Sequence, residues 1–173
     1  MIRFTILAAT AVAAIALTGC DRHAGAGNGT DISFSSNDAD GAVSGGIDKD
    51  GNLRINANGF NADVRLPRIA LDANNFDMNG VHLYPGSTIS SINVAGQDGD
   101  REDDKGKVAV AFTSPAAAAT VRDWLNERLA KAGYKLSAAG NGLTGTTDKG
   151  QSFALKLDDD GAGKSKGAIE IGK

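Results

Sequence analysis

Two glycine-flanked motifs near the end of the chain have residue types that could carry chemistry. Gly163-Lys164-Ser165-Lys166-Gly167 matches the G-x-S-x-G pattern of a serine nucleophile, and its first three residues match the end of a phosphate-binding loop. A nucleophile elbow needs a histidine after the serine, but none of the residues after Gly167 is histidine. The phosphate loop needs glycine where Asp158 stands and a helix after the loop. We therefore predict no catalytic residue and no nucleotide site.

Four turns rich in Asp and Asn could offer oxygen ligands to calcium, and they span residues 38–41, 48–51, 56–59 and 77–80. An EF-hand loop that begins at Asp48 would place Leu53 where glycine is required, and Gly59 where the bidentate Glu is required. Asp and Asn before Gly are also the residues that tight turns prefer. We interpret these segments as turns, keep calcium as the alternative, and predict no metal site.

Histidines and clustered carboxylates are the remaining candidates for catalysis. His23 and His82 are the only histidines, and two histidines without a cysteine partner cannot form a zinc site unaided. The run Asp158 to Asp160 falls in a hairpin loop, where nothing excludes water enough to raise a carboxyl pKa for acid catalysis. We therefore expect a protein that is not an enzyme and that uses no cofactor.

Residues 1–20 have the three parts of a bacterial lipoprotein signal peptide. Arg3 supplies the positive start, and the apolar run from Phe4 to Leu17 is shorter than the roughly 18 to 20 residues of a membrane-spanning helix. Leu17-Thr18-Gly19-Cys20 then resembles a lipobox. The resemblance implies cleavage before Cys20 and attachment of lipid to its sulfur. The alternative is an ordinary secretory signal followed by an incidental cysteine.

A lipidated Cys20 would anchor the protein in a bacterial envelope membrane, facing the periplasm. Cys20 is the only cysteine, so no disulfide can form within one chain. Asp21 resembles the signal that keeps enteric lipoproteins in the inner membrane. This rule varies between lineages, so the sequence does not decide between the inner and the outer membrane. Residues 21–31 are small and polar with interspersed glycines, which predicts a flexible tether.

Composition narrows the classes of fold and partner. The formal net charge of −3 argues against nucleic acid as a partner. Leu, Ile, Val and Phe account for about a fifth of the residues after the leader, so the core must be thin and built mainly from sheet. The length after the leader fits one domain, or one domain with an appendage.

Residues 32–79 predict a segment of short β-strands, because brief apolar and polar alternations are separated by turn residues. The clearest strand runs from Phe60 to Leu66, with Phe60, Ala62 and Val64 on one face. Asn58-Gly59 predicts a hairpin turn before it, because both residues tolerate positive φ. The pattern does not decide whether this segment packs onto the later sheet.

Residues 80–173 predict a two-layer α+β domain, in which one amphipathic helix packs across an antiparallel sheet. The helix is expected to begin at Ser114-Pro115, where Ser caps the free amides, and to end at Gly133. The expected strands lie near residues 81–83, 89–94, 108–112, 134–137, 143–147, 153–157 and 168–171.

The predicted helix carries an apolar stripe that would face the sheet. Its members are Ala118, Val121, Trp124, Leu125, Leu129 and Ala132. We expect Trp124, the only tryptophan, to be the main core side chain. The alternative is a groove between helix and sheet, in which Trp124, Val121 and Leu125 hold a small apolar ligand.

The order of motifs in the second half resembles small proteobacterial envelope lipoproteins of unknown function. The resemblance covers residues 80–172 and rests on Val81 to Ser87, Phe112 to Pro115, the helix ending Ala132-Gly133-Tyr134, and Leu143 to Thr147. The segment is more loosely similar to helix-grip domains such as those of the BAM-complex lipoprotein C. The resemblance implies a fold and transfers no binding or catalytic residue.

Together these patterns predict a lipid-anchored, periplasm-facing component that interacts with or scaffolds another envelope protein. The membrane would be contacted through Cys20. A module that binds a small apolar ligand or a lipid is the alternative.

Overall fold

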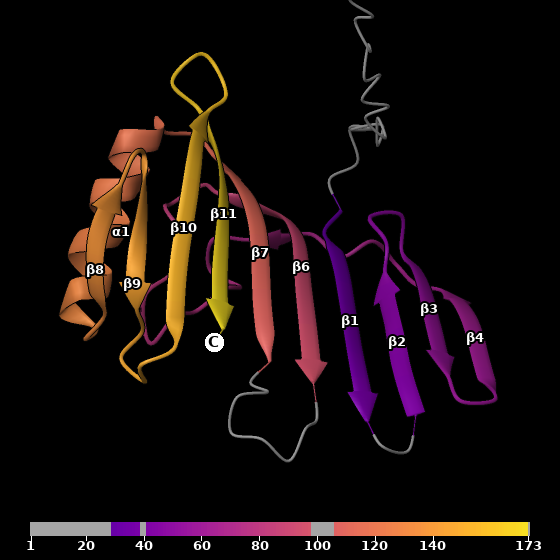
Figure 1. The fold of residues 1–173 in the computed structure, drawn as a ribbon. Coiled ribbons are helices and arrows are strands. Elements are labelled where there is room, and N and C mark those ends of the chain that lie inside the picture. The colour runs from indigo at the N-terminus through magenta and orange to yellow at the C-terminus, as the bar shows by residue number, and fades with distance from the viewer. Residues whose placement is uncertain (1–28, 39–40, 98–105, 173) are drawn as a thin grey trace, which may run out of the picture.

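A computed structural model of the chain describes residues 29–38, 41–97 and 106–172. The predicted leader and residues 21–28 of the predicted tether lie outside this range, as does the lipidation site. Figure 1 shows a broad sheet with a helix at one end. The elements are β1 (Asp31–Asp38), β2 (Gly41–Ile47), β3 (Asn52–Ala57), β4 (Phe60–Arg65), β5 (Leu71–Asp72), β6 (Thr88–Gln97), β7 (Lys107–Ser114), α1 (Ala118–Lys131), β8 (Lys135–Ala139), β9 (Gly142–Thr146), β10 (Ser152–Asp159) and β11 (Ser165–Gly172).

The strands form one mixed sheet with the order β4-β3-β2-β1-β6-β7-β11-β10-β9-β8, and β5 pairs with β6. β1 and β6 run parallel, whereas the other neighbouring pairs run antiparallel. The predicted α+β class is confirmed in this broad form, with a mostly antiparallel sheet and one helix packed against it. The early hairpins belong to this same sheet, because β1 pairs with β6 from Asp31 to Asn37.

Two continuous apolar rows run across one face of the sheet. Residues paired across neighbouring strands project from the same face, so the register identifies each row. The first row contains Val64, Leu53, Ile47, Ile32, Ile92, Val110, Ile169, Leu155 and Leu143. The second contains Ala62, Ile55, Gly45, Phe34, Val94, Val108, Ile171 and Phe153. The sheet is therefore apolar on this face from one end to the other.

A second layer covers only part of this face. Helix α1 packs against β8, β9, β10 and β11, and Figure 1 shows it at the β8 end of the sheet, away from β1 to β4. Residues of the segment 73–87, including Met78, Val81 and Leu83, complete the same core. Among the described residues, every buried hydrophobic side chain comes from Ala73 or later. The core is thus confined to one half of the sheet.

The start of α1 differs from the prediction. Ser114, the expected cap, is the last residue of β7, and its Oγ has no hydrogen-bond partner among the described residues. The cap position is Ala117, and the backbone N–H of Ala118 donates to Asp159 Oδ1 at 2.9 Å. The predicted cap is wrong because the residues between Ser114 and Ala118 carry the chain from the sheet to the second layer. A carboxylate from β10 therefore supplies the cap.

The end of α1 follows the prediction. Gly133 has a φ of 93°, and its N–H donates to the carbonyl oxygen of Ala130 at 3.1 Å. Glycine adopts this left-handed conformation without a steric cost, and the conformation ends the helix.

The Asn58-Gly59 turn between β3 and β4 is also confirmed, with Gly59 at a φ of 78°.

The centre of the core differs from the prediction too. Phe112 and Phe153 are its largest fully buried side chains, whereas Trp124 is only partly buried. The ring of Phe112 occupies the space that a side chain on Gly167 of β11 would need. The predicted role of Trp124 as main core side chain is wrong, because Trp124 lies beside the inward stripe of α1 rather than within it.

The segment expected as a strand near residues 81–83 is irregular, with one isolated bridge between Asp77 and His82.

Thr30, just before β1, connects the early strands to the half of the sheet that contains β5 and β6. Its Oγ1 donates to the carbonyl oxygen of Ile89 at 2.7 Å and accepts from the N–H of Leu71 at 3.0 Å. Thr30 therefore holds the start of β1 against β5 and β6.

Candidate functional site

The structure places two of the three predicted groove residues in the core. Val121 and Leu125 are fully buried on the side of α1 that faces the sheet, and neither lines the pocket beside Trp124. Trp124 lies on the flank of the helix and lines a pocket there. Cys20, the predicted lipidation site, lies outside the described residues.

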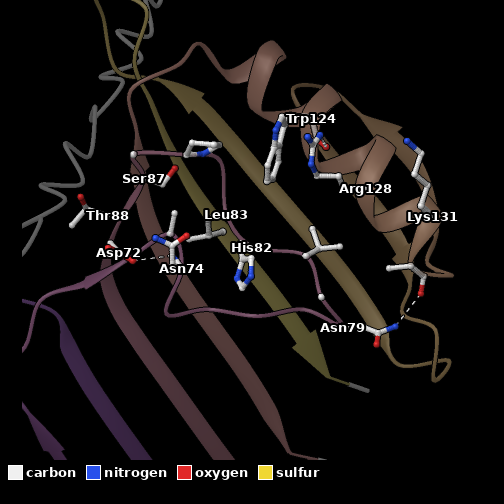
Figure 2. A pocket seen from close by; sticks show the side chains of 16 residues that line it. Asp72, Asn74, Asn79, His82, Leu83, Ser87, Thr88, Trp124, Arg128 and Lys131 are labelled. Carbon is white, nitrogen blue, oxygen red and sulfur yellow. Dashed lines mark hydrogen bonds between the residues drawn. The ribbon is translucent and has the colours of Figure 1, made fainter.

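This pocket has a volume of about 680 Å³ and lies between the flank of α1 and the irregular segment 72–88. Figure 2 shows its lining from both sides, with Trp124, Arg128 and Lys131 projecting from the helix and His82 from the segment opposite. Leu83, Val81 and Ala73 are buried core residues that also line the pocket. The pocket thus has an apolar base and a polar rim.

Trp124 forms one wall of the pocket and is held between two neighbours. The Arg128 guanidinium lies 4.0 Å from the centre of the indole ring, a cation–π contact. The Tyr84 ring meets the indole edge-on, with 5.7 Å between ring centres. These contacts keep the indole ring at the pocket wall.

The polar groups of the rim come mainly from the segment 72–88. Asp72 Oδ1 accepts a hydrogen bond from the N–H of Asn74 at 2.8 Å. Asn79 Nδ2 donates to the carbonyl oxygen of Ala132 at 3.1 Å, which ties this segment to the end of α1. His82 Nε2 lies 3.9 Å from Asp77 Oδ2. Hydrogen bonds of Asp72 and Asn79 therefore help to hold the rim in place.

Ser87 is the one lining residue with an unmet hydrogen bond. Its side chain is 1 % exposed, and its Oγ has no partner among the described residues. A buried hydroxyl without a partner is unfavourable and uncommon. The pocket wall therefore contains a polar group with unused hydrogen-bonding capacity.

A second candidate surface is the part of the apolar rows that no second layer covers. We call it the open apolar face: the row positions on β1 to β4, together with Val43 of β2, Phe60 of β4 and Val94 of β6, which project from the same side of the sheet. Its most exposed members are Phe34, Val43, Phe60, Val64 and Val94, and Phe60 is 57 % exposed. Within the described residues, the positions of this face on β2, β3 and β4 carry no charged side chain.

The size of the open apolar face sets it apart from scattered surface hydrophobics. Five neighbouring strands of about six residues span roughly 20 Å by 20 Å, or about 400 Å² of flat area. A patch of this size matches the largest apolar patch of a typical monomeric protein, and such patches are often functional. The opposite face of the same strands is polar, with Arg54 Nε 3.2 Å from Asp63 Oδ1. Only one side of these strands is therefore suited to an apolar contact.

The serine of the G-x-S-x-G sequence is buried in a structural contact. Ser165 is the first residue of β11 and is 1 % exposed. Its Oγ donates to the carbonyl oxygen of Ala116 at 2.8 Å. Ser165 therefore helps to hold the chain ahead of α1 against the sheet.

The acidic turn at Asp48 has the hydrogen bonds of a loop that is closed by its own side chains. Asp48 Oδ1 accepts from the N–H of Asp50 at 2.9 Å and from the N–H of Asn52 at 3.0 Å. The pKa of the Asp48 carboxyl group lies below its usual 3.8. The largest cause is the hydrogen bond from the Asn52 side chain, followed by the hydrogen bond from the Asn52 backbone.

No cluster of three metal-ligating side chains occurs in residues 29–38, 41–97 and 106–172.

Within the described part of the chain, α1 is too short and too polar to span a bilayer. Comparison with known proteins yields no match to a family model, to a curated protein sequence or to a solved structure.

The open apolar face was missed by the sequence reasoning, although a signal for it existed. The alternation in residues 32–66 places every large apolar side chain on one side of its strand, and one helix is too small to cover all the predicted strands. The pocket residues Arg128, His82 and Ser87 were also missed, because they converge from segments that are far apart in the sequence.

Proposed function

We propose that this protein is a lipid-anchored, periplasm-facing interaction component of the bacterial cell envelope. We further propose that it docks another envelope protein on the open apolar face. The partner's contact surface would be apolar and uncharged, of similar size.

The observation that carries this proposal is the contrast within a single row of the sheet. Val110 is 1 % exposed under the second layer, whereas Val64 in the same row is 48 % exposed. Both halves of the row have the same apolar character, but only one half has a cover within the chain. A partner surface on the other half would remove a comparable apolar area from water.

The lack of charge on the open apolar face supports a partner of matching chemistry. A charged partner surface would lose its hydration there without gaining an ion pair. The proposed anchor supports a partner in the envelope, because a tether of about ten residues spans only about 15 to 20 Å. β1, which belongs to the face, begins at Asp31, where this tether ends.

Site-specific photocrosslinking in intact cells tests the docking surface. A photoreactive residue at Val43 lies on the open apolar face, and Ser44, the next residue of the same strand, points to the opposite face and is the matched control. We expect one protein adduct from position 43, none from position 44, and loss of the adduct in the Cys20→Ala form. The captured protein, once identified and purified, should bind the wild type and Ser44→Glu but not Val43→Glu.

Equal labelling from both positions, or none from either, would overturn the proposal. An adduct between two copies of this chain would replace the envelope partner with self-association. Lipidation itself is tested by metabolic labelling with palmitate, which should label the wild type and leave Cys20→Ala unlabelled.

A second candidate function is the binding of a small apolar ligand or lipid, and the pocket beside Trp124 favours it. Its volume of about 680 Å³ falls in the range of small-molecule sites, roughly 300 to 1,000 Å³. Because Trp124 is the only tryptophan, its fluorescence reports on this pocket directly. A saturable change in Trp124 emission on addition of a ligand would support this candidate. Unchanged emission across a panel of lipids and metabolites would count against it.

A further inference from the structure

We propose that the pocket beside Trp124 binds a small amphipathic anion, with its apolar part against Trp124 and Pro85 and its anionic group beside Arg128. This inference deepens the second candidate function and rests on it. It assigns a charge to the ligand, which the apolar-ligand proposal leaves out.

Arg128 is the cation of the pocket lining that has no carboxylate within 4.0 Å among the described residues. Lys131, the other cation of the helix flank, lies 2.6 Å from Glu127 and is already paired. The guanidinium is fixed by its contact with the Trp124 ring, so its position costs little further ordering when a ligand binds. Arginine also offers several N–H donors in one plane, which suits a carboxylate or a phosphate.

The apolar part of the ligand would lie along the wall and base of the pocket. Trp124 supplies part of its indole ring, and Pro85 and Ala132 supply accessible apolar surface beside it. Burial of an alkyl chain or an aromatic ring on this surface would contribute the hydrophobic part of the affinity. The combination of this base with a single unpaired cation favours an amphipathic molecule over a free inorganic ion.

The other end of the pocket would orient the ligand. Figure 2 shows Asp72 at the end opposite Arg128, so a negative group would be repelled there and attracted to the helix flank. The anionic group of a ligand would therefore lie at the Arg128 end of the pocket and not at the Asp72 end.

Matched probes that differ only in their head group test the inference. Octanoate, monooctyl phosphate and octan-1-ol share one alkyl chain, and inorganic phosphate supplies the anion alone. Each is titrated into the full chain carrying Cys20→Ala, purified without detergent, while Trp124 emission is followed. We expect saturable changes with at least one of the two octyl anions, and at least about tenfold weaker binding of octan-1-ol and of inorganic phosphate. A preference between the two octyl anions identifies the head group as carboxylate or phosphate.

Two arginine variants on the same helix separate a specific role from a general charge effect. Arg128→Gln should abolish the preference for the anions over octan-1-ol. Arg122→Gln should keep it, because Arg122 does not line the pocket and instead contacts Asp123 and the carbonyl oxygen of Gly140. Circular dichroism of both variants would show that they remain folded.

The outcomes distinguish this inference from the function on which it rests. Equal affinity for octanoate, octyl phosphate and octan-1-ol would overturn the anion site and leave an apolar-ligand pocket. An unchanged preference in Arg128→Gln would also overturn it. No saturable response to any octyl probe would overturn both the inference and the second candidate function.

Discussion

The ring of Phe34 on β1 lies across Gly45 on β2. A Cβ atom on residue 45 would stand 2.6 Å from Cζ of that ring and 2.7 Å from the carbonyl oxygen of Arg54 on β3. The absence of a side chain at position 45 therefore leaves room for the Phe34 ring over β2. It also lets β2 approach β3 closely.

Gly45→Val should destabilise the protein and lift the Phe34 ring away from the sheet. The added side chain meets backbone as well as ring, so we expect a loss of about 1 to 3 kcal/mol in the free energy of unfolding, measured with urea. Gly96→Ala on β6 is the control, because a Cβ there meets only ordinary contacts of 3.6 Å or longer. Similar losses in the two variants would contradict the close contact at position 45.

Truncations within one apolar row should differ in cost. Leu155 is 2 % exposed under the second layer, and its replacement by Ala should cost about 2 to 5 kcal/mol in a urea titration. Leu53 occupies the same row on β3 but keeps part of its surface in water, so Leu53→Ala should cost less than about half as much. Equal costs in the isolated protein would mean that something covers the open apolar face in solution.

Thr30→Val should loosen the joint between β1 and the rest of the sheet. The substitution preserves the shape of the side chain but leaves the N–H of Leu71 and the carbonyl oxygen of Ile89 without their hydrogen-bond partner. We expect a loss of about 1 to 3 kcal/mol, measured by thermal or urea unfolding. Thr30→Ser keeps the hydroxyl and should lose much less. If both variants behaved alike, the hydrogen bonds would not be the cause.

The Asp48 turn should weaken in acid. Because the pKa of this carboxyl group is lower in the folded protein than its usual 3.8, its contribution to stability is present above 3.8 and is lost as the pH falls through the lower folded value. Thermal unfolding followed from pH 6 down to pH 2 should show this loss in the wild type. Asp48→Asn, which cannot titrate, should show a smaller dependence on pH over the same range. An Asp48 pKa above 3.8, measured by NMR, would contradict the assignment.

Local patterns in the sequence predicted several elements well. The alternation from Phe60 to Leu66 placed Phe60, Ala62 and Val64 on one face, as the register confirms. Asn58-Gly59 predicted its hairpin, and Gly133 predicted the end of the helix. Each of these features depends on side-chain alternation or on backbone conformations that glycine or asparagine favours, which neighbouring residues decide among themselves.

The start of α1 and the role of Trp124 could not be predicted from local sequence patterns. Asp159, which caps the helix, lies far along the chain from Ala118, so Ser114 was the only candidate visible nearby. Trp124 matched the apolar periodicity of the helix, but a position at the margin of the stripe can face either the core or the flank. Packing of the segment 72–88 against the helix decided this, and it created the pocket at the same time.

The amino-acid sequence by itself determined the strand alternation of β3 and β4, the Asn58-Gly59 turn and the amphipathic helix α1, because these depend on residues close together in the chain. Only the tertiary structure decided that β1 joins β6 and that Val64 and Val110 share one row with different exposure. It also decided that Arg128, Ser87 and Trp124 meet around one pocket. These features depend on which distant strands pair and on how far the second layer extends, and both follow from the folding of the whole domain.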